Sequence, residues 1–221
     1  EVALSKAGTP DINLSIDNKN FEYVKDFVSI SNGDDGTVSA DEIVFVGYGI
    51  ENEKYSNYKG LDVKDKIVLI KSGEPKNGDN YTVSGTTEKS KWSTRQQYSA
   101  KRKVAYDKGA KAILFYSPDI YPMVAKNFGS ASGRISLKDD GNNDRKMYYF
   151  FVNTSIAKTI SNNIDTDVTP KVIKTPITFK YTGKSKDVSS ENVVAFIKGS
   201  EKPDEILVIS AHLDHEGVKD G

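Results

Sequence analysis

The stretch YSAKRKVAYDKGAKAILFY, Tyr98 to Tyr116, contains the pattern that decides the fold of this 221-residue chain. Its first half predicts an amphipathic helix, and Gly109 is placed to end that helix in a left-handed conformation. Its second half, Ala112 to Tyr116, is an unbroken apolar run typical of a buried strand. The apolar face expected for the helix is formed by Ala100, Val104 and Ala105.

A second apolar run, KIVLI at residues 66–70, precedes this stretch and is separated from it by the polar residues 71–91. Ser93 and Gln96 have the spacing of a capping box, which predicts the start of the helix. Strand, helix and strand in this order predict a βαβ unit whose two strands run parallel with a right-handed crossover.

Further strands are expected on both sides of this unit. Upstream they are Ile12 to Ile16 and EIVFVGYGI at residues 42–50, and downstream MYYFFVN at residues 147–153 is followed by a short helix. Pro170 and Pro176 mark the expected domain boundary. After them only strands are predicted, and the last two are expected to pair antiparallel. These strands are ITFKYTG (177–183), NVVAFIKG (192–199) and EILVISA (205–211).

The composition argues against several classes of function. Lys plus Arg and Asp plus Glu both number 31, so no net charge attracts the chain to nucleic acid or to an anionic membrane. No apolar run approaches the ~20 residues that cross a bilayer. With no cysteine, a metal site would be built from His, Asp, Glu and water. Because the chain starts without methionine and stops soon after its last strand, we expect a piece of a longer protein.

The only two histidines lie in ILVISAHLDHEG, residues 206–217. In an extended strand His212 and Asp214 project to the same side. That geometry suits a metal ligand whose second ring nitrogen is held by a carboxylate. A local hydrogen bond or a helix cap is the plainer reading of the same pair, and His215, which points the other way, is assigned to packing. A serine hydrolase would have to use one of these two imidazoles as its base.

The end of the chain resembles the opening of the catalytic domain of the M28 zinc peptidases, the aminopeptidase and glutamate-carboxypeptidase-like family. That family shows an N-V-[VI] strand, a glycine hairpin and an apolar strand that ends in A-H-x-D-H-x-G. The residues that match here are Asn192, Val193, Val194, Gly199, Ala211, His212, Asp214, His215 and Gly217.

The preceding region is similar to a protease-associated (PA) domain, a β-rich module inserted into many members of that family. The matching segments are VFVGYGI (44–50), YSNYKGLDVKDKIVLI (55–70) and KVAYDKGAKAILFYS (103–117). The two resemblances imply an α/β fold in which a PA domain with a βαβ unit precedes the first strands of the M28 sheet. The expected divisions are a lead-in at residues 1–40, the PA domain at 41–172, and the truncated catalytic domain at 173–221.

The M28 resemblance implies a zinc-dependent exopeptidase, with an aminopeptidase favoured, that hydrolyses peptides at a pair of zinc ions. His212 matches the first metal ligand, and Asp214 matches the aspartate that orients it at the catalytic centre. The bridging aspartate, the general base and the other ligands of the family are not in this sequence, so this piece alone is expected to be inactive.

The resemblance also implies an exported, extracellular or periplasmic protein with a peptide substrate. Two readings from other classes stay open. One is a non-catalytic PA-type binding module or receptor-like relative, which the intact His212-x-Asp214 disfavours. The other is a carbohydrate-binding or adhesive β module, which the 12 tyrosines suggest, although tyrosine is also common in ordinary strands.

Overall fold

A computed structural model describes residues 2–30, 34–53, 55–129, 135–137, 147–190, 194–202 and 204–210. At its centre is a six-stranded sheet whose four inner strands run parallel, while the two edge strands are antiparallel to their neighbours. In spatial order the strands are β13 (Lys171–Ile173), β6 (Ile43–Phe45), β7 (Ile67–Lys71), β10 (Ala112–Tyr116), β12 (Tyr148–Val152) and β4 (Phe27–Ser29).

The predicted βαβ unit is confirmed. Strands β7 and β10 pair in parallel with Ile67 opposite Ala112, and helix α1 (Gln97–Asp107) connects them. Gly109 has a φ of +87°, as predicted for the residue that ends this helix. The capping box is not formed, because the hydroxyl of Ser93 donates to Glu74 over 2.6 Å and α1 begins only at Gln97.

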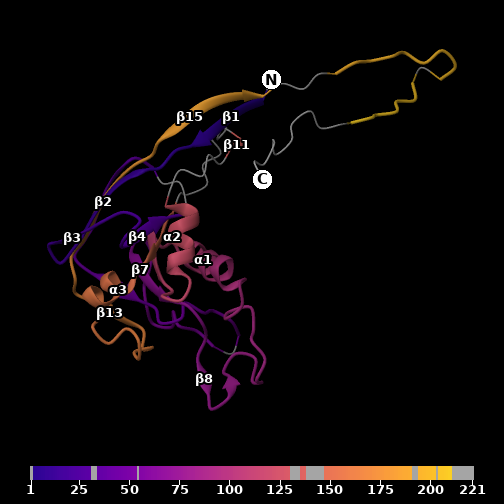
Figure 1. The fold of residues 1–221 in the computed structure, drawn as a ribbon. Helices are drawn as coiled ribbons and strands as arrows, with labels where there is room; N and C mark the ends of the chain where they lie inside the picture. The colour runs from indigo at the N-terminus through magenta and orange to yellow at the C-terminus, as the bar shows by residue number, and fades with distance from the viewer. Residues whose placement is uncertain are drawn as a thin grey trace, which may run out of the picture.

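The molecule is built in three layers, with the six-stranded sheet in the middle (Figure 1). One face of this sheet packs on α1 and on α2 (Tyr121–Phe128). The other face packs on α3 (Thr154–Ile160) and on a second sheet. Every residue of β7, β10 and β12 is buried because both faces are covered, which explains their continuous apolar sequences.

The second sheet has four antiparallel strands and combines residues from both ends of the sequence. Its strands, in order, are β3 (Lys19–Phe21), β2 (Asp11–Ile16), β14 (Ile177–Thr182) and β5 (Gly36–Ala40). In β2 and β14 every second side chain is buried in the core, as expected for a sheet with one buried face and one solvent-exposed face. The strand predicted at Ile12 to Ile16 is therefore confirmed.

The packing does not follow the divisions expected at residues 40 and 172. Strand β14 pairs with β2 and β5, and β13 pairs with β6, so residues 11–40 and 171–182 share one core with the βαβ unit. The expected lead-in is an integral layer of this unit. The prolines Pro170 and Pro176 flank the edge strand β13 and do not separate two packed bodies.

A three-stranded sheet that contains the first and last strands, β1 and β15, lies beside the layered body (Figure 1). Strand β1 (Val2–Ala7) pairs with β15 (Ser185–Ser190) along its whole length, and β11 (Ile135–Leu137) pairs with the other edge of β1. Between the β1–β15 and β2–β14 ladders, the three residues 8–10 lie opposite the two residues 183–184. The strand that leads from β1 into β2 therefore carries one extra residue, as in a β-bulge. A small hairpin of β8 (Lys76–Asn77) and β9 (Asn80–Tyr81) completes the strands.

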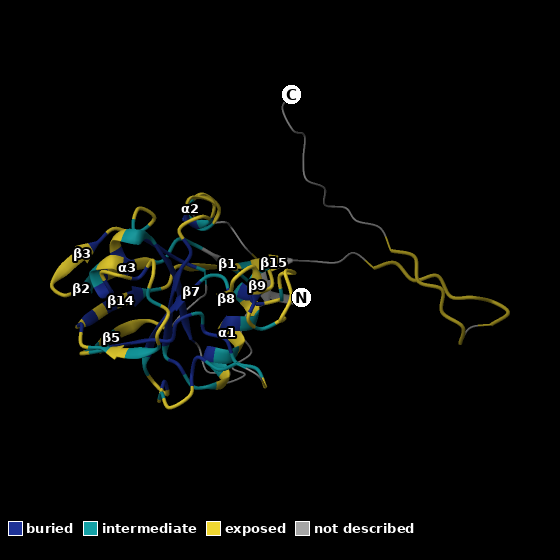
Figure 2. Ribbon diagram, turned by 90° about the horizontal axis from the view of Figure 1, so that it is seen from below, coloured by how far each residue is buried: buried dark blue, intermediate teal, exposed yellow. Residues whose placement is uncertain are grey.

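The antiparallel pair predicted at residues 192–199 and 205–211 is not formed within the described residues 194–202 and 204–210. Their apolar side chains are exposed, Ile197 by 93% and Ile209 by 87%, and the segment extends away from the layered body (Figure 2). A lone hairpin with no third strand or helix to cover its apolar face is only marginally stable in water. No described helix has the length and apolar character needed to cross a membrane.

Candidate functional site at the carboxyl edge of the sheet

The predicted metal ligand His212 and the catalytic aspartate Asp214 lie in residues 211–221, outside the described residues, as does His215. Their roles remain predictions. Within the described part of the chain, no group of three or more His, Asp or Glu side chains could hold a metal ion.

The described segment that leads to His212 shows how the chain approaches that position. In it, the amide of Glu205 donates to the carbonyl of Lys202 over 3.2 Å and the two side chains form an ion pair of 2.9 Å. After Glu205, the side chains of Ile206, Leu207 and Val208 are each at least 74% exposed. Such a contiguous apolar run is typical of a segment that is buried against further protein.

Within the described residues, the most unusual polar cluster lies where strand β7 ends and α1 covers it. Lys101 of α1 has no exposed surface, although lysine is almost never fully buried. Its Nζ donates to the carbonyls of Gly73 over 2.6 Å and Lys71 over 3.0 Å, and it lies 3.3 Å from Oε1 of Gln97. Burial lowers the pKa of Lys101 to about 7, against the opposing attraction of the Glu74 carboxylate.

Gln97 and Glu74 organise the loop that follows β7. Oε1 of Gln97, a buried side chain, accepts a hydrogen bond of 2.7 Å from the amide of Gly73. The carboxylate of Glu74 accepts from the amide and hydroxyl of Ser90 and from the hydroxyl of Ser93, at 2.6–3.0 Å. The buried carboxylate is therefore hydrogen-bonded by neutral donors.

Lys71, the last residue of β7, is held on the opposite face of the sheet. Its Nζ donates to the carbonyls of Asp165 over 3.1 Å and Asp167 over 3.0 Å, and burial lowers its pKa. The ring centroid of Tyr48 lies 5.9 Å from Nζ of Lys71 and 5.8 Å from Nζ of Lys101. The end of β7 is thus secured by one lysine from each side, and both approach the same aromatic ring.

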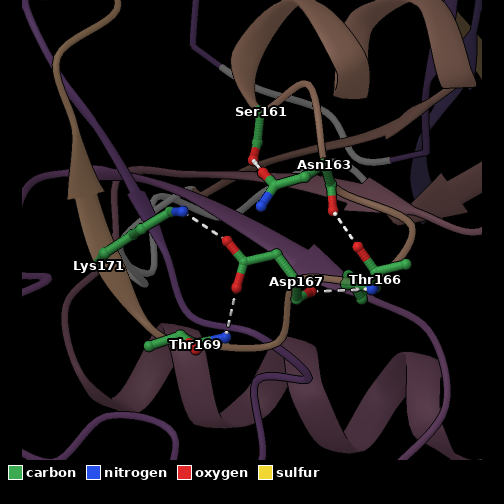
Figure 3. A network of polar contacts seen from close by, with 7 residues as sticks. Ser161, Asn163, Thr166, Asp167, Thr169 and Lys171 are labelled. Carbon is green, nitrogen blue, oxygen red and sulfur yellow. Dashed lines mark hydrogen bonds and ion pairs between the residues drawn. The ribbon is translucent and has the colours of Figure 1, made fainter.

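The loop that offers its carbonyls to Lys71 is braced by its own side chains (Figure 3). The carboxylate of Asp167 accepts from the amide of Thr169 over 2.9 Å and pairs with Lys171, which lowers the pKa of Asp167. The hydroxyl of Ser161 donates to Oδ1 of Asn163 over 3.0 Å. These contacts hold the backbone of residues 161–171 in one arrangement.

The side chains of this cluster hold main-chain segments in place. They are not arranged as a nucleophile beside a general base. Lys101 and Lys71 both donate to main-chain carbonyls, and Glu74 is occupied by serine donors. What the arrangement can do is hold residues 72–96, the loop between β7 and α1, against the end of the sheet.

Sequence reasoning missed these residues. The predicted apolar stripe of α1 correctly included Ala105, but the fully packed face is Gln97, Lys101 and Ala105. Their spacing of four residues places them on one side of the helix. The sequence signal for this face was therefore the alignment of two polar residues, Gln97 and Lys101, with the buried Ala105. A hydropathy pattern assigns two such polar residues to the solvent-exposed side of a helix.

No family model matches the chain, and no curated protein matches it. Solved structures that are similar include an aminopeptidase from Aneurinibacillus sp. strain AM-1, with 17% identity and a TM-score of 0.46, over 84% of this chain and 34% of that one. The zinc aminopeptidase BSAP from Bacillus subtilis matches with 13% identity and a TM-score of 0.42, over 84% and 34%.

A Peptidase M28 precursor from Shewanella amazonensis SB2B matches with 15% identity and a TM-score of 0.39, over 91% of this chain and 41% of that one. The subtilisin-like protease Apa1 from Pseudoalteromonas sp. AS-11 matches with 12% identity and the same TM-score, over 83% and 36%. The chain therefore spans between about a third and two fifths of the length of these structures.

Proposed function

We propose that this chain is part of an M28-type zinc exopeptidase, an aminopeptidase in the first instance. The observation that carries the proposal is the pattern that ends in Ala211-His212-x-Asp214-His215-x-Gly217 after an apolar strand sequence. The exposed apolar run at residues 206–209 supports it, because a segment of that kind is expected to be an inner strand of a larger sheet.

The donor set fits zinc. An imidazole nitrogen is a preferred zinc ligand, and a carboxylate beside it can hold the second ring nitrogen. In the proposed site His212 would hold one ion, and Asp214 would accept a hydrogen bond from the other ring N–H and so fix the tautomer. A bound zinc pair would polarise the scissile carbonyl and lower the pKa of a water molecule. The remaining ligands and the general base would come from residues that are not in this sequence.

The described unit is proposed to act as the PA-type domain of that enzyme. Its first and last strands, β1 and β15, pair with each other, so in a longer protein both of its connections would lie at one place. A unit attached in this way can shape access to a neighbouring active site. The enzyme would be exported, with a peptide as its substrate.

A non-catalytic binding module is the second candidate, and activity measurements separate the two. In the longer protein, His212→Ala is expected to reduce hydrolysis of amino-acid anilides by at least about a thousandfold, because a metal ligand is lost. His215→Ala is the matched control, since His215 is assigned to packing, and it should keep most of the activity. If the wild type has no turnover, the binding module is favoured. If His212→Ala keeps wild-type turnover, His212 is not a ligand of the catalytic metal.

A further inference from the structure

The hairpin of β8 and β9 forms the tip of the loop between β7 and α1, at the end of the molecule far from β1 and β15 (Figure 1). Its ladder has only two residue pairs. Asn77 lies opposite Asn80, and residues 78–79 form the turn that joins them. A pair of strands this short has little stability of its own, so the tip can open at a small cost in free energy.

Asn77 and Gly78 are adjacent at this tip, and both are exposed. Within the described part of the chain, the side-chain amide of Asn77 and the backbone N–H of Gly78 make no hydrogen bond. Apart from its chain neighbours, a Cβ added at Gly78 would meet no heavy atom within 4 Å. Asn77 is also the one described asparagine that a glycine follows. Its side-chain carbon and the nitrogen of the next residue are therefore free to approach each other.

We propose that the Asn77–Gly78 sequence is a modification site: in the folded chain Asn77 deamidates spontaneously, with water as the co-reactant. The backbone nitrogen of Gly78 attacks the side-chain carbonyl carbon Cγ of Asn77 and gives up its proton. As that C–N bond forms, the bond from Cγ to the side-chain nitrogen breaks, and ammonia leaves with the proton. Water then hydrolyses the cyclic succinimide to aspartate or to isoaspartate, and nothing is oxidised or reduced.

Gly78 makes this position suited to ring closure. The peptide group between the two residues must rotate before the nitrogen reaches Cγ of Asn77, and glycine allows that rotation because it has no Cβ. Gly78 already has a φ of +61°, a conformation that other residues adopt only at a cost. Because the tip is exposed, the rotation displaces water and not packed side chains.

Two other asparagines show what protects a side chain from this reaction. Asn80 is equally exposed, but the amide that follows it, that of Tyr81, donates to the carbonyl of Thr86 over 2.8 Å. The side chain of Tyr81 is buried, so this nitrogen cannot reach Cγ of Asn80 without moving an anchored ring. Asn153 caps α3, and its side-chain amide is hydrogen-bonded through both its oxygen and its nitrogen.

The two products change the hairpin in different ways. Aspartate keeps the backbone and adds a negative charge next to Lys76 in the sequence. Isoaspartate directs the main chain through the side-chain carbon, which adds one carbon to the path between β8 and the turn. The two-residue turn then no longer matches the ladder, so β8 should separate from β9. The base of the loop is held independently, by Glu74 with Ser90 and by Gly73 with Lys101, so the change should stay at the tip.

Peptide mass spectrometry of the whole folded chain, incubated at mildly alkaline pH, tests the proposal. The peptide that contains Asn77 should gain the mass of an amide-to-acid conversion, and fragmentation should place that gain at position 77 and not at Asn80. The same incubation in urea gives the rate for the unfolded chain. The rate in the folded chain should lie within about tenfold of it, because the tip opens readily.

Asn77→Gln should remove the gain at position 77, since its longer side chain would have to close a larger ring. Asn80→Gln is the matched control on the opposite strand, and it should leave the reaction at Asn77 unchanged. Deamidation of Asn77 that is absent, or more than about tenfold slower in the folded chain than in urea, would overturn the proposal, because it would show that the hairpin protects this side chain. Conversion of Asn80 as fast as that of Asn77 would equally contradict it.

Discussion

At the level of single residues, backbone positions with positive φ show how closely the loops approach the sheet. Gly47, just after β6, has a φ of +55°, and a Cβ there would lie 2.6 Å from the carbonyl oxygen of Val168. Gly78, in the β8–β9 turn, has a φ of +61°, but a Cβ there would have no heavy atom within 4 Å. The two glycines share a conformation and differ only in their surroundings.

Gly47→Ala is therefore expected to lower the free energy of unfolding by about 3 kcal/mol, because alanine is strained in the left-handed conformation and its Cβ would clash with the backbone. Gly78→Ala should cost only about 1 kcal/mol, for the conformation alone. Urea unfolding of both variants measures the difference. Equal losses would show that the loop after β6 does not pack against residue 168 as the structure has it.

Glu42 joins three strands and makes the fold sensitive to acid. Its carboxylate binds Lys174, after β13, and Lys66, before β7, and these two partners lower its pKa to about 2. Because the pKa in the folded state lies below the ordinary value of 4.5, the stabilisation is fully present above about pH 4.5 and is lost as the pH falls toward 2.

Glu42→Gln should lower the midpoint of urea unfolding at pH 7 and flatten its decline between pH 5 and pH 3. Asp107→Asn, which removes an exposed ion pair within α1, should leave the acid profile unchanged. A Glu42→Gln profile that runs parallel to the wild type down to pH 3 would remove Glu42 from the acid response.

At the level of elements, the sequence predicted the central strands and α1 because each carries its signal locally. The apolar runs of β7 and β10 are read directly, and Gly109 marks the end of the helix between them. The capping box failed because Ser93 is used by Glu74, a contact across nineteen positions that spacing cannot reveal. The segment after residue 191 has the apolar sequence of two strands, but among its described residues the apolar side chains are exposed and the predicted pair is not formed. A strand pair needs a further strand or a helix against its apolar face to be stable.

Two leucines test this contrast between buried and exposed apolar runs. Leu114 in β10 has no exposed surface, whereas Leu207 is 86% exposed. Leu114→Ala should reduce the free energy of unfolding of this chain by about 3 kcal/mol, since it leaves a cavity. Leu207→Ala should change it by less than about 0.5 kcal/mol. A loss of similar size for Leu207→Ala would mean that residues 206–209 are already packed in the chain as it stands.

At the level of the whole molecule, the α/β class and the βαβ unit were predictable, but the three-layer arrangement was not. The second sheet pairs residues 11–16 with 177–182, and no local pattern indicates a contact of that sequence separation. For the same reason the polar cluster at Lys101 was missed, since its acceptors on Gly73 and Lys71 come from another element. The motif at His212 was found because it is contiguous, and its role remains a proposal.

The most direct test of the peptidase proposal is the zinc content of the longer protein, purified without chelators and measured by mass spectrometry of the metal. The proposal predicts two zinc ions per chain in the wild type and a clear loss in His212→Ala, with His215→Ala retaining both. A wild-type protein that carries no zinc, or a His212→Ala variant that carries the full amount, would contradict it.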